Sequence, residues 1–311
     1  MSSDLTYGLS LRHGVVTNPD GSFDTQGFTE LVRHGEAVGF DHVLVPDHVF
    51  VPEYWGKVIT DVWLEPFALL SYLAAVTSRI ELVIACLVVP YRQPFVAAES
   101  VATLDQLSGG RAALGIVPGY LKEEFEAFAL PLEERNAMTN EFVRIMIELW
   151  MSTSASFDGS YYRFEGVELK PPCVRRPHVP IWVGGSSRAA LKRVAEFGDV
   201  WTPLGFTVVN ESYRESHEEE LAGKSLPTSG TTPEQLAAGI ALARQLAADA
   251  GRDLSALQVV VAPNKLTTRV ERLREYVEAG ATGFVFNVPG ESVAECRASI
   301  DGYAAEVMAT L

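Results

Sequence analysis

Segments with the composition of β-strands alternate with segments of helical periodicity along almost the whole chain. Ile80–Val89 is apolar at nearly every position, which is typical of a strand buried on both faces of a sheet. The next segment, Phe95–Gly110, places apolar residues at helical spacing and ends on two glycines. About eight such units follow one another in 311 residues. This number predicts an α/β fold and favours a closed (β/α)8 TIM barrel over an open parallel sheet.

The same two patterns predict the other elements. The expected strands are Thr6–Leu11, His42–Pro46, Arg111–Val117, Ile181–Val183, Asp199–Thr202, Gln258–Ala262 and Gly283–Val288. The expected helices are Phe28–Gly39, Glu65–Thr77, Glu123–Phe128, Asn136–Trp150, Arg188–Phe197, Pro233–Ala250, Arg269–Ala279 and Glu291–Leu311.

Two stretches interrupt the alternation. Residues 157–178 are rich in aromatic residues, glycine and proline, which indicates an inserted hairpin or an extended excursion. Residues 206–232 form a polar, acidic stretch that is too long for an ordinary connection. The sequence contains no internal repeat and no stretch with the composition of a linker. A single domain over residues 1–311 is therefore predicted.

Charge and cysteine content exclude several classes of protein. The formal net charge of −15 argues against a nucleic-acid partner and against binding to anionic membranes, and leaves a small molecule as the expected partner. No apolar run approaches 18 residues, and the first residues lack the pattern of a signal peptide. The three cysteines have neither disulfide-framework nor metal-site spacing. A cytoplasmic protein without a metal site is expected.

In a TIM barrel the chemistry lies at the carboxyl ends of the strands, so the residues there are the first candidates. Asp47 and His48 follow the second expected strand and would suit proton transfer. The alternative is that Asp47 caps local backbone while His48 packs. His13 follows the first strand and would line the same mouth.

The third and fourth strands end in residues suited to a close approach by a ligand. Cys86 is either a nucleophile or, since its strand is apolar, a small buried thiol. Pro118 and Gly119 shape a turn that a flat ligand could approach, and Tyr120 would present its hydroxyl there. No G-x-G-x-x-G or Walker motif is present.

The segment Gly184–Ser187 joins an expected strand to an expected helix. Glycines allow close approach to the backbone, and the N–H groups of a first helical turn attract anions. Arg188 and the nearby Arg175 and Arg176 would suit the same anion. The alternatives are a tight turn with a serine cap and a solvated helix face.

Three segments together resemble the bacterial luciferase-like oxidoreductases. They are PDH at Pro46–His48, PYRQPFVAAESVATLDQLSGGRAALGIVPGYLKEEFEAF at Pro90–Phe128 and PIWVGGSSRAALKRVAEFGD at Pro180–Asp199. The resemblance extends from Tyr7 to about Tyr303 and is closest in style to the branch that uses the deazaflavin coenzyme F420. Another branch uses FMN.

The resemblance implies a TIM barrel with an isoalloxazine-like ring at its mouth. It places His48 near the reactive centre of the ring, with Asp47 beside it. It implies a bulge at Cys86–Leu87, which often holds a cis non-proline peptide behind the ring. The cofactor phosphate would be held by Gly184, Gly185, Ser186 and Ser187, with Arg188, Arg175 and Arg176 toward an anionic tail.

One position departs from the deazaflavin-dependent sugar-phosphate dehydrogenases. Those enzymes have a proton-donating glutamate where this chain has Tyr120, so a sugar phosphate is not the expected substrate. Tyr120 or His48 would then exchange the proton. A pocket with an aromatic, apolar character is expected from residues such as His13, Tyr91 and Trp201, although core packing explains aromatic residues equally well.

The expected activity is hydride transfer between F420 and a small organic substrate. One alternative is an FMN-dependent monooxygenase, which uses oxygen and needs a flavin reductase. A second alternative is a cofactor-binding protein without turnover. The resemblance also implies a homodimer formed through the helices expected at Glu65–Thr77 and Phe95–Leu107.

Overall fold

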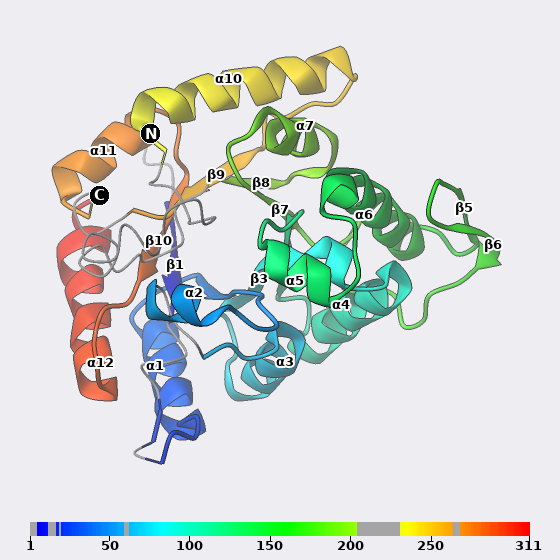
Figure 1. Ribbon diagram of the computed structural model, residues 1–311. Helices are drawn as coiled ribbons and strands as arrows, with labels where there is room; N and C mark the ends of the chain where they lie inside the picture. Colours follow the sequence, from blue (N-terminus) through cyan, green and yellow to red (C-terminus); the bar gives the residue numbers. More distant parts are fainter. Residues whose placement is uncertain (1–4, 12–16, 19, 59–61, 204–230, 264–267) are drawn as a thin grey trace.

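Eight parallel strands close into a barrel in the order β1-β2-β3-β4-β7-β8-β9-β10 (Figure 1). The computed structural model describes residues 5–11, 17–18, 20–58, 62–203, 231–263 and 268–311. The predicted TIM barrel is therefore confirmed. Its strands are β1 (Thr6–Ser10), β2 (His42–Val45), β3 (Glu81–Val88), β4 (Ala112–Val117), β7 (Ile181–Gly184), β8 (Val200–Thr202), β9 (Gln258–Val261) and β10 (Gly283–Asn287).

The helices surround the barrel (Figure 1). The larger ones are α1 (Thr25–Ala37), α3 (Pro66–Val76), α4 (Pro94–Ser108), α6 (Arg135–Met151), α7 (Arg188–Phe197), α10 (Pro233–Asp249), α11 (Val270–Glu278) and α12 (Val293–Gly302). Two six-residue helices, α2 (Glu53–Val58) and α5 (Lys122–Ala127), follow β2 and β4. Because they follow strands, both lie at the carboxyl end of the barrel.

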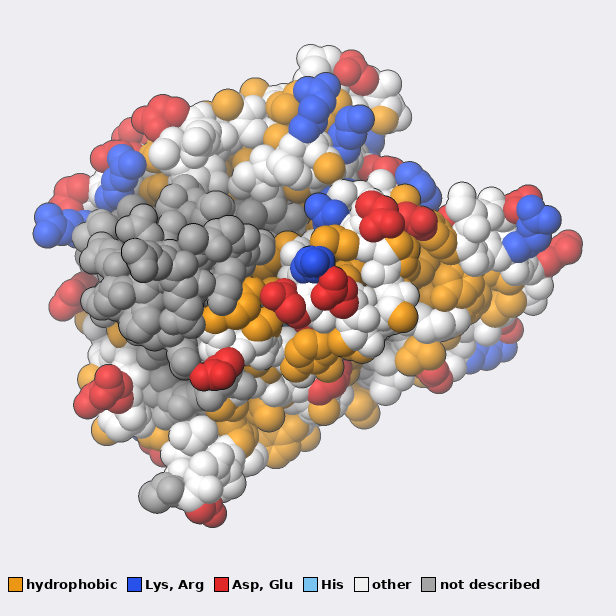
Figure 2. Space-filling model, in the orientation of Figure 1, with side chains coloured by type: hydrophobic (Ala, Val, Ile, Leu, Met, Phe, Trp, Pro, Cys, Tyr) orange, Lys and Arg blue, Asp and Glu red, His pale blue; other side chains and the backbone are white. Residues whose placement is uncertain are grey.

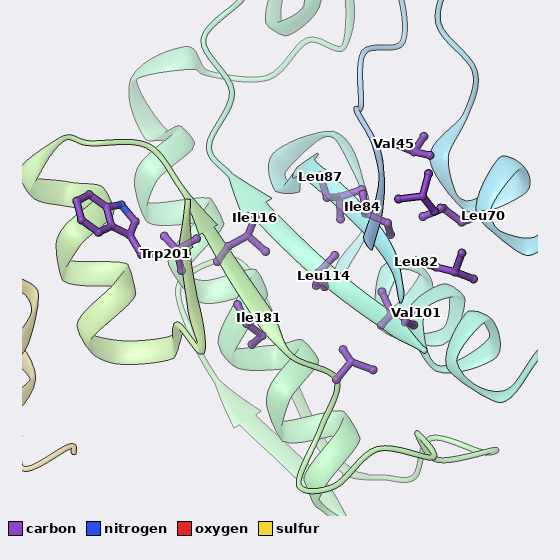
Figure 3. Close-up of a cluster of buried hydrophobic side chains, with 14 of the residues drawn as sticks. Val45, Leu70, Leu82, Ile84, Leu87, Val101, Leu114, Ile116, Ile181 and Trp201 are labelled. Atoms are coloured by element: carbon purple, nitrogen blue, oxygen red, sulfur yellow. The ribbon is translucent and has the colours of Figure 1, made fainter. Parts of the chain in front are cut away.

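Alternation along each strand sorts the side chains into two layers. The outward layer packs against the helices, and Figure 3 shows Ile84, Leu114 and Ile181 from the strands in one cluster with Leu70 and Val101 from α3 and α4. The inward layer is a separate, smaller cluster. It consists of Leu44, Val83, Ala85, Ala113, Trp182, Val200, Val260, Ala262 and Val285.

The barrel becomes emptier toward its mouth. Counting two residues onward from the inward layer gives small or polar residues on four of the strands. They are Gly115 on β4, Gly184 on β7, Thr202 on β8 and Asn287 on β10. A layer of this kind leaves room above the barrel core for a ligand.

Strand β3 is irregular where Cys86 lies. Its register with β4 shifts between Ile84 and Leu87, and the Ala85–Cys86 peptide bond is cis. The bulge and cis bond expected from the family resemblance are therefore present at this strand.

The interruption expected at 157–178 begins with a two-stranded antiparallel hairpin, β5 (Ala155–Asp158) and β6 (Arg163–Val167), which lies outside the barrel (Figure 1). The buried Glu141 of α6 accepts hydrogen bonds from the backbone N–H groups of Ser160, Tyr161 and Tyr162. The acidic stretch expected at 206–232 lies almost wholly outside the described residues. Within the described part of the chain, no helix has the length and apolar character needed to cross a membrane.

Candidate active site

His48 lies at the mouth of the barrel, three residues beyond the end of β2. Its Nδ1 lies 3.1 Å from Glu124 Oε2 on α5, and its side chain is 11% exposed. The ring is surrounded by aromatic rings, with centroid distances of 4.7 Å to Trp63, 5.2 Å to Trp55 and 6.1 Å to Tyr120. One ring nitrogen of His48 is thus turned to a carboxylate within an otherwise apolar surrounding.

Glu124 is fully buried and connects three segments of the chain. Besides its contact with His48, it accepts the backbone N–H of Val49 at 3.0 Å and the hydroxyl of Tyr91 at 3.1 Å. A buried carboxylate is costly unless it is hydrogen-bonded, and here three partners meet that requirement. The loop after β2 and the turn after β3 are therefore attached to α5 through one side chain.

Asp47 has a structural set of partners. Arg92 binds it in a two-pronged manner at 2.6 and 2.8 Å, and the backbone N–H of Val88 donates to it at 2.9 Å. Burial raises the pKa of the Asp47 carboxyl, and the Arg92 guanidinium opposes that shift. The expected neighbour of His48 is therefore engaged elsewhere, and Glu124 takes the place beside the imidazole.

A cavity of about 450 Å³ opens beside this aromatic group. Trp63, whose ring touches His48, forms part of its wall together with Val49 and Phe50. Figure 2 shows hydrophobic and acidic side chains together on this face of the molecule, over the region of α5. The cavity suits an organic molecule with a substantial apolar part.

Tyr120 stands at the rim of the same group, with its ring 6.0 Å from that of Trp55. Burial and the charge of Glu124 raise the pKa of its hydroxyl well above the ordinary value. Tyr54 donates a hydrogen bond to Glu123 at 3.2 Å, and burial and Glu123 raise its pKa to about 12. Both phenols therefore keep their protons at neutral pH, and Tyr54 uses its proton to donate to Glu123.

Cys86 lies between two strands that carry glycine beside it. A Cβ atom on Gly115 or on Gly184 would lie 3.0 Å from Cys86 Sγ. Burial raises the pKa of the Cys86 thiol well above its usual value, so the thiol stays protonated. Cys86 is thus a protonated, partly exposed thiol at the floor of the mouth, which argues against its role as a nucleophile.

The Gly184–Ser187 segment leads from β7 into α7. Gly184 is needed for packing, since a Cβ atom there would lie 2.5 Å from Val117 Cγ1, and Gly185 has a φ of +105°. Ser187 caps the helix by accepting the N–H of Ala190 at 3.1 Å. Ser186, Ser187 and Arg188 are exposed. The serine cap is therefore present, and the side chains of Ser186 and Arg188 are exposed at the start of the helix.

The residues of the mouth fit a flat cofactor with a phosphate. Thr202 faces Gly184 in the register of β8 and β7, and its Oγ1 is buried and has no hydrogen-bond partner within the described part of the chain. Unpaired buried hydroxyls are rare in folded proteins. An orphaned hydroxyl, a layer of small side chains and an exposed helix start lie within one part of the barrel.

The structure corrects the prediction for Trp201. This side chain is 1% exposed, donates through Nε1 to the carbonyl of Gly185 at 2.8 Å, and packs where a Cβ atom on Gly239 of α10 would lie. It belongs to the outward layer because Val200, beside it, faces inward. Trp201 is therefore a core residue and does not line the pocket.

Four other residues that were predicted for the site lie on the strands and turns around the mouth. Leu87 has a side chain buried in the outward layer near Ile84 (Figure 3), so only its backbone borders the mouth. Tyr91 lies beside the site and reaches it through Glu124. Pro118 and Gly119 form the predicted turn after β4, with Gly119 at a φ of +77°. His13 lies outside the described residues.

Arg175 lies at the opposite end of the barrel from the expected anion site. Its Nη2 lies 2.7 Å from Glu81, the first residue of β3, and its Nε donates to the carbonyl of Gly110. The prediction that it meets a cofactor tail is wrong. The sequence alone could have shown this. Arg175 shortly precedes β7, and a residue that precedes a strand lies at the amino end of that strand.

Glu124 is the site residue that sequence reasoning missed. It is one of three glutamates in the run KEEFE, and nothing in that run distinguishes it from Glu123 or Glu126. Its burial distinguishes it from the other two glutamates. The sequence offers only a weak signal of this burial, because the adjacent Phe125 is also buried. Among the described residues, no group of three or more His, Cys, Asp or Glu is arranged to hold a metal ion.

A family model described as luciferase-like monooxygenase matches residues 7–225. The chain belongs to this family. The luciferase-like assignment rests on more than half of the chain and includes both β2 and the start of α7.

Relatives by sequence include flavin-dependent monooxygenases. An FMNH(2)-dependent dimethylsulfone monooxygenase of Pseudomonas putida is 34% identical over 190 residues, which is 60% of this chain and 51% of that protein. A pyrimidine monooxygenase, RutA, of Bradyrhizobium is 31% identical over 58% of this chain and 53% of its own. This chain thus spans about half the length of these relatives. An uncharacterised Mycobacterium bovis protein is 27% identical, covering 88% and 92% of the two chains.

Solved structures with the same fold include an F420-dependent enzyme and a monooxygenase. An F420-dependent secondary alcohol dehydrogenase, solved with an F420–acetone adduct, has a TM-score of 0.74 at 18% identity and covers 99% of each chain. The monooxygenase RslO1 of Streptomyces bottropensis has a TM-score of 0.71 at 18% identity, covering 98% and 99%. At these identities the likeness shows the fold alone.

Proposed function

We propose that this luciferase-like enzyme transfers a hydride between coenzyme F420 and a small apolar substrate that interconverts an alcohol and a carbonyl group. When bound, the deazaflavin supplies a centre that donates or accepts two electrons as hydride. Oxidation of an alcohol releases one hydride and one proton, so the protein must also provide a place for the proton.

The observation that carries this proposal is the placement of His48. The imidazole lies at the mouth between aromatic rings, with Nδ1 on the buried Glu124. A histidine held by a carboxylate is suited to take a proton from a hydroxyl group or return it to a carbonyl. His48 is therefore the proposed catalytic residue for proton exchange with the substrate.

The other mouth residues would bind and orient. Ser186, Ser187 and Arg188 would hold the cofactor phosphate at the start of α7, and the ring would lie over Gly184, Thr202 and their small neighbours. Trp63 and Phe50 would cover the apolar part of the substrate and exclude water. Tyr120 would donate a hydrogen bond from the rim.

An FMNH2-dependent monooxygenase is the second candidate. It is favoured by the 34% sequence identity to the dimethylsulfone monooxygenase. The F420-dependent secondary alcohol dehydrogenase is 18% identical to this chain. Such an enzyme would consume oxygen and would need a flavin reductase to supply reduced flavin.

Binding of F420 and of FMN, oxidised and reduced, measured side by side by fluorescence quenching, separates the two candidates. Tight F420 binding with weak FMN binding supports the hydride-transfer proposal, and the reverse supports the monooxygenase. Binding of neither overturns the phosphate site at Ser186–Arg188. Ser186→Asp should weaken the bound cofactor by repelling its phosphate, whereas the control Ser154→Asp, on the exposed segment before β5, should not.

A further inference from the structure

We infer that Glu124 is the positioning residue of the site and holds His48 as the tautomer with its proton on Nδ1, leaving the Nε2 lone pair for the substrate. This inference rests on the proposed function for its role in turnover. The tautomer itself is a property of the protein alone.

The donors around Glu124 decide the direction of the contact. The backbone N–H of Val49 can only donate, and it occupies Oε1. The hydroxyl of Tyr91 donates to Oε2, the same oxygen that lies 3.1 Å from His48 Nδ1. A carboxylate that accepts on both oxygens accepts from the imidazole as well, so the ring proton lies on Nδ1.

Tyr91 supports this direction because it stays protonated. Burial and the charge of Glu124 raise the pKa of its hydroxyl far above the ordinary value. Glu124 itself is fully buried, so water does not compete for its oxygens. The three bonds therefore hold the carboxylate in one orientation, and the carboxylate holds the ring.

Among the residues that the structure describes, the other groups near His48 do not offer a competing partner for Nδ1. Both oxygens of Asp47, the adjacent carboxylate, are bonded to Arg92. Trp55, Trp63 and Tyr120 meet the imidazole as rings at centroid distances of 4.7–6.1 Å. Glu123, the next acidic residue on α5, accepts from Tyr54.

The tautomer fixes what His48 can do to a substrate. With Nδ1 bonded to Glu124, the neutral ring accepts a proton only at Nε2. Once it has done so, the imidazolium lies against an acceptor of opposite charge, which stabilises it. Glu124 thus acts through His48 and touches no reacting atom.

The test begins with the full chain, ¹⁵N-labelled and without added cofactor. Long-range ¹H–¹⁵N correlation spectra distinguish the two histidine tautomers, and His48→Gln assigns the His48 signals. We expect Nδ1–H in the wild type, loss of that preference in Glu124→Gln, and no change in the matched control Glu123→Gln. An Nε2–H tautomer in the wild type, or an unchanged tautomer in Glu124→Gln, overturns the inference.

Turnover provides the second readout. Glu124→Gln should lower kcat by about 10- to 100-fold with KM changed less, and should move the acid limb of the pH–rate profile to lower pH. Should Glu124→Gln fail to fold, Tyr91→Phe removes only one donor and should weaken the Nδ1–H preference by less; an unaltered tautomer and profile there contradict the inference. If neither F420 nor FMN supports turnover, the proposed function fails while the NMR result still decides the tautomer.

Discussion

Each end of the barrel holds a histidine within about 3 Å of a glutamate, although only the carboxyl-end pair also has hydrogen-bond geometry. At the amino end, His42 Nδ1 lies 2.9 Å from Glu81, and the two residues begin β2 and β3 as register partners. At the carboxyl end, His48 Nδ1 lies 3.1 Å from Glu124. Residue type and distance alone therefore do not separate a structural pair from a functional one.

The third partner and the surroundings separate them. Glu81 also bonds Arg175 at 2.7 Å, and the His42 ring meets the edge of Trp182, so a second charge and core packing complete the amino-end pair. Among the described residues, the further partners of Glu124 are neutral, and Trp63, whose ring packs against His48, lines a cavity. The comparison teaches that the role proposed for His48 depends on what lies open beside its aromatic neighbours, and not on the carboxylate contact itself.

The largest expected effect is a loss of turnover on replacing His48 at the mouth of the barrel. His48→Ala should lower kcat by about 10²- to 10⁴-fold, because it removes the group that exchanges the proton. Cofactor affinity should change little, since the proposed phosphate site is at the start of α7. Steady-state kinetics and fluorescence titration check the two parts, and unchanged turnover would remove His48 from its proposed role.

The amino-end pair should show the opposite behaviour. Glu81→Ala leaves His42 and Arg175 without their shared partner and should lower the free energy of unfolding by about 3 kcal/mol. Urea denaturation measures this as a lower midpoint at unchanged m-value. The kcat of the folded variant should stay within about twofold of the wild type. A large loss of kcat at full folding would contradict the division between the two ends.

The next largest effect is expected at acid pH, where the stabilisation that Glu81 provides at the amino end should be lost. Burial raises the pKa of Glu81, but hydrogen bonds and charges from His42 and Arg175 outweigh burial and lower it overall. Its stabilising effect is therefore complete above the unfolded-state pKa of about 4.3 and is lost as pH falls through the lower folded-state value. The difference in unfolding free energy between wild type and Glu81→Gln should narrow below about pH 4.3, and a difference that stays constant to pH 2 would contradict this.

The smallest expected effect is on cofactor affinity. It distinguishes Arg188 from Arg175, two arginines that the sequence analysis assigned to the same anion. Arg188→Ala should weaken cofactor binding by about two- to fivefold, as expected for an exposed charge at a helix start. Arg175→Ala should leave cofactor affinity unchanged and lower stability through Glu81. Titration of both variants with the cofactor tests this. Equal cofactor affinities for Arg188→Ala and the wild type would limit the proposed phosphate site to Ser186 and Ser187.

The barrel could be predicted because every strand–helix unit carries its own periodicity, and a strand such as β3 is apolar at every position after Glu81. His48 could be found because it follows a strand. Glu124 could not, because the contact with His48 spans 76 residues and only the closed barrel brings them together. Trp201 was misplaced because β8 has three residues, too few to show which face points inward. The predicted homodimer and the single domain stay predictions.

The acidic residues have a further consequence for anyone who wishes to alter the isoelectric point of this protein. Several of them accept backbone N–H groups from distant segments and so take part in holding the loops. These are Glu36, Asp41, Asp47, Asp105, Glu124, Glu141 and Asp199. Neutralising substitutions that leave these positions untouched would remove charge from the −15 total and preserve the loops, whereas substitutions chosen by charge alone would release them.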